Sequence, residues 1–469
     1  MKRPILLLLA LSYGIALLAQ HKTCEQMIGW RGDNIELRAI SDKYNRKSCL
    51  LLINRDSVRG FLLDSAAMIV GEFGIERGDH EKLAGGFIKD NNIYIYLHDE
   101  HSGKLHNWIC DLRTGEKKDR NFPAESKTEK IVERVSGGDR FLYFTADRKT
   151  FDLSMYDIHD EKTVDTFTYH FEDKIWKYFT KNNHSGRPLN VSAIDHMGNC
   201  SAEIAQVPNK IYFAEDSLYL LMNDEKGITR IYSFDIQRRQ ANSRVIQHND
   251  RNVSDSVEDG YTDNSYLLNG KLYFISATRD SLWIQVTDFA SGLLLKNYAV
   301  GRDEEIKFKN TPIIQEGGAF SSGGKRELGS TSQLIRKIVN GKAVISATSE
   351  DNGVVCLSIG SYQEVTAGSG GGGGMFMPLA GGTPMVYAQI APFSGAAGWS
   401  KSVHFKMLLD ANSFEHIGGE LGPGFTEKID TYTKGVDTEP EGETLFMNYG
   451  RHVLGYYDRG WHKLVVAGF

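Results

Sequence analysis

The residues with the most distinctive chemistry lie in a glycine-rich stretch in the last third of the chain. Five consecutive glycines, 370–374, are followed by five large apolar residues: Met375, Phe376, Met377, Phe393 and Trp399. The glycines lack the Lys-Ser/Thr ending of a P-loop, so a nucleotide phosphate is not the expected ligand. A flexible backbone that carries methionine and aromatic side chains suits burial against another protein. The pattern predicts a partner-docking segment, and an unstructured crossing loop is the alternative.

Recognisable catalytic and metal-binding arrangements are absent from the sequence. Ser369 lacks the flanking glycine of a nucleophile elbow, because Ala367 occupies that place. The 14 histidines are scattered, and the five cysteines lack the short spacing of a zinc or redox site; Cys24 with Cys49 is one possible disulfide. We expect no cofactor. The alternative is calcium, bound by carboxylates of an acidic loop that contains Asp255, Asp259 and Asp263.

The N-terminus has the form of a secretory signal peptide. Lys2 and Arg3 precede an apolar run that ends at Ala19, after which the chain becomes polar. We expect cleavage after Ala19, an exported protein in the periplasm or associated with the outer membrane, and no further membrane-spanning segment. The formal net charge of −6 excludes a nucleic-acid binder by electrostatics.

The elements that must position these residues are short strands. The segment Gly270–Gly292 alternates apolar and polar residues on either side of the turn at Arg279–Ser281, which predicts a β-hairpin. Similar clusters recur along the chain and close on aspartates at positions 111, 157, 235 and 288. Intervals of this size resemble those of β-propeller blades.

This resemblance implies an all-β fold, a β-propeller of seven or eight four-stranded blades. We expect residues 20–48 to form an N-terminal extension and residues 49–469 to form the propeller. Insertions are expected at 168–207, 249–264 and 367–400. The alternative fold is a pair of β-sandwich domains separated within residues 317–330, which are rich in glycine and serine.

An Asp-Ser pair followed by an apolar residue recurs five times. This pattern resembles the O-glycosylation signal of exported proteins in Gram-negative bacteria with a Bacteroides-like envelope, although the same residues suit a hairpin turn. The candidate serines are Ser57, Ser65, Ser217, Ser256 and Ser281.

Taken together, these patterns favour a non-enzymatic exported scaffold that docks to a membrane-associated envelope or secretion complex. One alternative is a glycan- or peptide-processing enzyme that uses the central cleft of the propeller, where acids and histidines would converge. Another alternative is a sensor that binds a ligand.

Overall fold

The hairpin predicted at Gly270–Gly292 is present in the computed structural model, as strands β20 (Lys271–Ala277) and β21 (Ser281–Asp288). Strands β19 (Thr262–Leu268) and β22 (Leu294–Gly301) flank it in a four-stranded antiparallel sheet. The described residues are 21–30, 35–42, 44, 46–121, 129–147, 149–160, 163–180, 191–194, 200, 202–214, 217–248, 260–317, 325–350, 353–364, 400–419, 428–429, 432 and 440–469.

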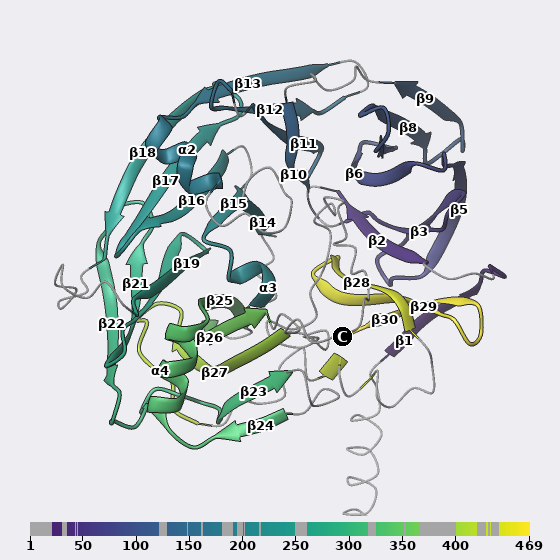
Figure 1. Cartoon of the computed structure of the whole chain (residues 1–469). Helices are drawn as coiled ribbons and strands as arrows, with labels where there is room; N and C mark the ends of the chain where they lie inside the picture. The colour runs from purple at the N-terminus through teal and green to yellow at the C-terminus, as the bar shows by residue number, and fades with distance from the viewer. Residues whose placement is uncertain are drawn as a thin grey trace, which may run out of the picture.

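Seven sheets stand in a ring, one per blade, with the first strand of each blade nearest the centre (Figure 1). Blade 1 holds β2 (Glu36–Ser41), β3 (Ser48–Ile53), β4 (Ser57–Leu63) and β5 (Ile69–Glu76). Blade 2 holds β6 (Glu81–Lys89), β7 (Asn92–Asp99), β8 (Leu105–Asp111) and β9 (Lys117–Asn121). Blade 3 holds β10 (Glu129–Gly137), β11 (Arg140–Asp147), β12 (Asp152–Ile158) and β13 (Val164–His170).

The remaining blades include the irregular ones. Blade 4 holds β14 (Val191–Ile194), β15 (Asn209–Ala214), β16 (Ser217–Glu225), β17 (Ile228–Asp235) and β18 (Gln240–Gln247), and blade 5 holds β19–β22. Blade 6 holds β25 (Lys342–Glu350), β26 (Val354–Glu364), β27 (Ser400–Asp410), β23 (Ile313–Gly317) and β24 (Lys325–Leu328). Blade 7 holds β28 (Pro440–Asn448), β29 (Arg451–Asp458), β30 (Lys463–Gly468) and β1 (His21–Met27). The prediction of an all-β propeller is confirmed, with seven blades in the described part of the chain.

The N-terminal boundary of the propeller differs from the prediction. Residues 20–48 are not an extension, because β1 is the outer strand of blade 7 and β2 is the inner strand of blade 1. The ring closes where β1 pairs with β30, with His21 opposite Gly468. The sequence of β1, HKTCEQM, lacks apolar alternation, as expected of an edge strand with one unpaired side.

The alternative fold, two β-sandwich domains separated within residues 317–330, does not hold. Strands β23 and β24, which flank residues 318–324, extend the outer side of blade 6, where β23 pairs with β27. Helix α4 (Thr331–Asn340) follows and packs on the same blade. The predicted insertion at 168–207 contains α2 (Asp173–Thr180) and the single turn α3 (Ala202–Ala205).

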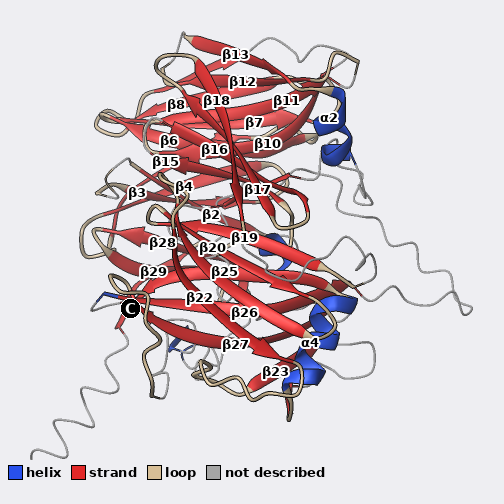
Figure 2. Ribbon diagram, turned by 90° about the vertical axis from the view of Figure 1, so that its left-hand side faces the viewer, coloured by secondary structure: helices blue, strands red, loops and turns tan. Residues whose placement is uncertain are grey.

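The connections between strands differ between the two faces of the ring. Each blade runs back and forth, so first-to-second and third-to-fourth strand turns lie on one face, which we call the short-turn face. The longest of these turns is 42–47. Second-to-third strand turns and links between blades lie on the opposite face, the long-loop face, together with α2 and α4 (Figure 2).

The closing aspartates organise the third turn of most blades. Asp111 Oδ1 accepts hydrogen bonds from the backbone N–H groups of Arg113 and Thr114, at 2.8 and 2.9 Å. These bonds, the one from Thr114 first, lower the pKa of the Asp111 carboxyl. In the same way, Asp288 accepts from the backbone N–H of Ser291 and Asp410 from that of Ser413. In blade 1, Asp64 accepts from the backbone N–H of Ala66. The repeated aspartate is therefore a turn-forming residue. Asp157 is the exception: it accepts from Arg140, and Asp160 accepts the turn bond from the backbone N–H of Thr163.

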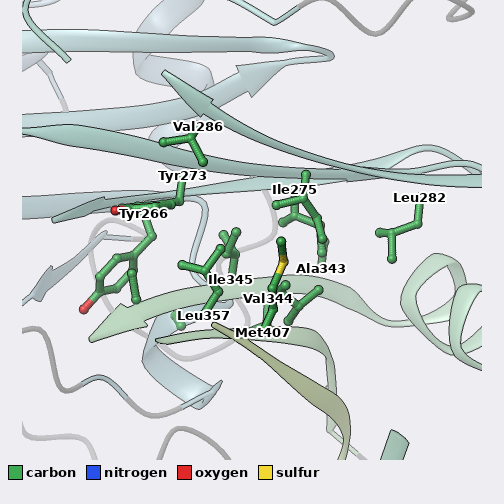
Figure 3. Packing of buried hydrophobic residues seen from close by; sticks show 14 of the residues in the cluster. Tyr266, Tyr273, Ile275, Leu282, Val286, Ala343, Val344, Ile345, Leu357 and Met407 are labelled. Atoms are coloured by element: carbon green, nitrogen blue, oxygen red, sulfur yellow. The ribbon is translucent and has the colours of Figure 1, made fainter. Parts of the chain in front are cut away.

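Neighbouring blades pack through apolar faces. Between blades 5 and 6, one apolar cluster contains Tyr273 and Ile275 of β20, Val344 and Ile345 of β25, and Met407 of β27 (Figure 3). All five side chains are buried. Each blade buries both faces of its inner strands, which a lone hairpin cannot do.

The structure also bears on the suggested disulfide and on the expected absence of a further membrane-spanning segment. Cys24 is half-buried and Cys49 is buried, and both are free thiols, so the suggested disulfide between them is not formed. Within the described residues, no helix is long and apolar enough to cross a membrane. Residues 1–19, the predicted signal peptide, lie outside the described part.

Candidate interaction face

The long-loop face carries all three insertions predicted from sequence. Residues 171–190, 248–261 and 365–399 each connect strand ends on this face. The connection from β22 to β25, which contains β23, β24 and α4, also begins and ends on this face. No turn of the opposite face exceeds the length of residues 42–47. The longest connections that begin and end on the same face are therefore those of the long-loop face.

The predicted docking residues Met375, Phe376, Met377, Phe393 and Trp399 lie outside the described residues. The residues that flank them are well placed: Glu364 at the end of β26 pairs with Ser400 at the start of β27. This pair closes the strand ladder of blade 6 at the long-loop face. The docking prediction stays a prediction, but the origin of the segment is defined.

Of the three aspartates predicted to bind calcium, one is among the described residues. Asp255 and Asp259 lie outside the described residues. Asp263, in β19, accepts a hydrogen bond from the backbone N–H of Gly227 at 2.9 Å, so it ties blade 5 to a turn of blade 4. Within the described residues, no three His, Cys, Asp or Glu side chains are grouped to hold a metal ion. Calcium binding by the loop stays a prediction.

Four of the five candidate glycosylation serines are described. Ser65 is exposed in the turn before β5, whereas Ser57, Ser217 and Ser281 are half-buried at the starts of strands. The Ser57 hydroxyl donates to Asn54 Oδ1 at 3.0 Å. Ser256 lies outside the described residues. Ser65 is thus the most accessible of the described candidates, and its modification stays a prediction.

An apolar patch that sequence reasoning missed lies where the ring closes. Met27, the last residue of β1, is 68% exposed, and Trp461, in the turn before β30, is 64% exposed. The Lys463 ammonium lies 5.8 Å from the centre of the Trp461 ring and 2.7 Å from Glu25 Oε1. Both apolar residues lie on the long-loop face. Tryptophan in a polar turn, Asp-Arg-Gly-Trp-His, is the signal that could have identified it.

Carboxylates at the starts of inner strands have structural partners. Glu36 forms an ion pair with Arg38, whose side chain is 1% exposed and whose pKa is lowered by burial to about 10. Glu441 Oε1 accepts from the backbone N–H of Ile35 at 3.0 Å, and so joins blade 7 to blade 1. Glu129 accepts from Tyr156 at 2.8 Å. Each of these carboxylates uses at least one oxygen for a structural contact, and the contact of Glu441 joins two blades.

A buried polar network occupies the centre of the ring beside blades 4 to 6. The Lys210 ammonium donates to the carbonyl of Val207 at 2.6 Å and to Asn264 Oδ1. The Asn264 amide donates to the carbonyls of Ala205 and Ala343, at 2.9 and 2.8 Å. Asn264 thus links α3 to the inner strand of blade 6 (Figure 1). Burial lowers the pKa of Lys210 to about 7.

The known proteins that resemble this chain share little sequence with it. No protein-family model matches the chain, and no curated protein matches its sequence. Among solved structures, the β-propeller domain of Nup133 from Vanderwaltozyma polyspora matches at 7% identity and a TM-score of 0.29, covering 58% of this chain and 76% of that chain. The WD40 domain of SCAP from fission yeast matches at 8% identity and a TM-score of 0.30, covering 96% and 98%.

An enzyme is also among these structures. Cobalt-substituted apocarotenoid oxygenase from Synechocystis matches at 7% identity and a TM-score of 0.30, covering 58% of this chain and 66% of that chain. Similarities at this level transfer no function to this chain. The assignment of the fold as a seven-bladed β-propeller stands on the sheet topology described above.

Proposed function

We propose that this chain is a β-propeller scaffold that acts by binding a partner protein through its long-loop face. The observation that carries the proposal is the one-sided placement of the long connections. Long connections that start from one face can lie beside one another, which a binding surface requires of its loops. The exposed Met27 and Trp461 add apolar area to the same face.

The proposal assigns a binding role in place of a catalytic one. The enzyme alternative needs two acidic or histidine side chains with free atoms converging at one mouth of the centre. Glu36 instead forms an ion pair with Arg38, and Glu129 accepts a hydrogen bond from Tyr156. Glu441 accepts from the backbone N–H of Ile35. These contacts give each of the three carboxylates a structural partner, which supports the binding role.

We further propose that the chain is exported and that its partner is part of an envelope complex. The first propeller strand begins at His21. Cleavage after Ala19 would therefore remove the signal peptide and leave every described strand intact. N-terminal sequencing of the protein from its natural host tests this step. A mature chain that starts at Gln20 is expected, and a chain that keeps residues 1–19 would contradict it.

The docking role is tested by replacing residues 367–397 with Asn-Gly. The remaining loop keeps the pair Glu364–Ser400, so the ladder between β26 and β27 survives. A photoreactive amino acid at position 461 reports on the long-loop face, and one at position 449 reports on the short-turn face. In the natural host we expect a specific crosslink from position 461 alone.

The loop replacement should weaken that crosslink while the melting temperature stays unchanged. As a control, the turn 112–116 on the short-turn face is replaced by a turn of the same length. Crosslinks from position 449 to the same partner would overturn the assignment of the face. A replacement variant that crosslinks as strongly as the wild type would remove residues 367–397 from the docking role.

A further inference from the structure

A groove crosses the outer edge of blade 1 near the long-loop face, and we call it the Trp30–Trp108 groove. Its volume is about 450 Å³, within the range of small-ligand sites. Its lining comes from three blades: Trp30 follows β1, Trp108 lies in β8, and the rest come from β4, β5 and β9. The lining residues are Trp30, Ser57, Arg59, Gly74, Ile75, Glu76, Trp108 and Lys117.

Gly74 of β5, which pairs with Arg59 of β4, leaves part of the groove without a side chain. An added Cβ at Gly74 would have a single neighbour within 4 Å, the carbonyl oxygen of Val58 at 4.0 Å. The position therefore opens into the groove. Trp30 and Trp108 are both half-buried, so part of each ring remains accessible. Each indole offers an accessible ring surface, and the missing side chain at Gly74 leaves room for a flat ring with apolar C–H groups.

The polar groups around these rings are mainly cationic. Arg59 lies over the Trp30 ring, 5.6 Å from its centre, and donates to the carbonyl of Ile28 at 3.3 Å. Lys117 donates to the carbonyl of Gly74 at 2.6 Å. A guanidinium has five N–H donors and an ammonium three, so both keep donors for a ligand. Glu76 is the one carboxylate in the lining, and it leaves a net positive site.

Two features of the Trp30–Trp108 groove restrict the class of ligand that it can bind. The Gly74 carbonyl on the edge strand is already engaged by Lys117, which opposes the addition of a peptide strand to β5. The indole N–H of Trp108 is buried and has no hydrogen-bond partner within the described residues. A ligand hydroxyl that reaches this wall after a small ring rotation would accept from it.

We propose that the Trp30–Trp108 groove binds an acidic oligosaccharide, a chain that contains uronic acid residues. The apolar face of a pyranose ring stacks on an indole, its hydroxyls meet Ser57 and Glu76, and its carboxylate pairs with Arg59 and Lys117. The site is separate from the long loops, so glycan binding and partner docking are independent properties of the chain.

The test is calorimetric titration of the full mature chain with tetragalacturonate and, as a shape-matched neutral control, its methyl ester. We expect binding of the acid, and an affinity for the ester that is lower by about tenfold. Added salt should weaken the binding of the acid. Equal binding of acid and ester, or no binding of either, would overturn the proposal.

Variants locate the site. Arg59→Gln and Trp30→Ala should each weaken binding of the acid by about tenfold, and Glu76→Gln should strengthen it, because it removes the one opposing charge. Trp461→Ala, which alters an exposed tryptophan outside the groove, is the matched control and should bind as the wild type does. Trp108→Phe keeps the wall and removes the N–H, so it stays informative if Trp108→Ala unfolds.

Two results would reject the groove as a glycan site. One is binding of tetragalacturonate that Arg59→Gln and Trp30→Ala leave unchanged while both variants melt as the wild type does. The other is an acidic peptide that competes for the groove and binds more tightly than the sugar. Loss of partner crosslinking in the loop replacement, with glycan binding retained, would separate this site from the proposed docking function.

Discussion

At the residue scale, a glycine in β6 determines how closely blades 1 and 2 approach each other. A Cβ at Gly86 would lie 2.3 Å from the carbonyl oxygen of Tyr94 and 2.6 Å from Cδ1 of Ile40. Neither the β7 backbone nor the packed Ile40 side chain can move away freely. Gly86 also donates its N–H to Ser136 of blade 3 at 2.9 Å. One residue thus positions three blades.

Gly86→Ala should lower the free energy of unfolding by about 3 kcal/mol, at the upper end of overpacking costs. Denaturant titration measures this change. Gly329→Ala is the control, because no atom lies within 4 Å of its added Cβ and its backbone φ is not positive. Equal stabilities of the two variants would show that the blades can separate at no cost.

His248 gives the fold an acid-sensitive position at the same scale. Its ring stacks on Phe274 with 3.6 Å between centroids, and Nε2 lies 2.9 Å from Thr229 Oγ1. Burial lowers its pKa to about 3, against an ordinary value of 6.5. Between these two pKa values, His248 is therefore protonated in the unfolded chain and neutral in the folded chain. The stability should fall as the pH drops from 6.5 towards 3.

His248→Gln should remove part of this pH dependence, up to about 3 kcal/mol between pH 6.5 and 4. Urea titrations at pH 7, 5.5 and 4 compare the slopes of stability against pH in the two proteins. Because only the slopes are compared, a difference in stability between the two proteins at any one pH does not affect the result. Parallel slopes would mean that His248 titrates alike in the folded and unfolded chains.

At the scale of elements, α4 covers the end of blade 6. The Ser330 hydroxyl accepts from the backbone N–H of Gln333 at 3.4 Å, so Ser330 is the N-cap. Leu334, Ile335 and Ile338 are buried against the blade. Their spacing of one, three and four residues places them on one helix face.

Leu334→Ala should reduce the free energy of unfolding by about 2–5 kcal/mol through loss of burial and a residual cavity. Ser330→Ala should cost about 1 kcal/mol through the cap. Gln333→Ala, at an exposed position of the same helix, should change little. Thermal melts rank the three variants, and any other order would contradict the packing of α4 described here.

At the scale of the whole molecule, the ring depends on a strand from each end of the described chain. His21 of β1 faces Gly468 of β30, in the place where other blades have a turn between the third and fourth strands. Pairing of β1 covers an edge of β30 that would otherwise be open to another chain. This explains why blade 7 has no closing aspartate after its third strand.

A circular permutant should therefore fold. A short linker from residue 469 to residue 21 completes the missing turn, and new ends at residues 113 and 114 open an existing turn of blade 2. We expect native circular dichroism and cooperative melting from this variant. Deletion of residues 21–27 should instead promote aggregation and lower the melting temperature. A deletion variant as stable and monomeric as the permutant would show that β1 does not close the ring.

The sequence by itself determined the repeated unit. Alternation in Gly270–Gly292 and the recurring aspartates are local features, and local turn and pleat chemistry predicts them. It also predicted the propeller and the positions of its long interruptions. Asp64 and Asp410 obey the same turn chemistry but were not recognised, since insertions and an early strand break the spacing around them.

Only the tertiary structure decided which strand closes the ring and which distant residues become neighbours. HKTCEQM has no pattern of its own, and it is a strand because the edge of β30 lacks a partner. Trp30 and Trp108 line the same groove only after blades 7, 1 and 2 have packed, so the groove has no signature in any single segment. Pairings across the chain depend on the geometry of the whole ring, and a local sequence pattern does not contain that geometry.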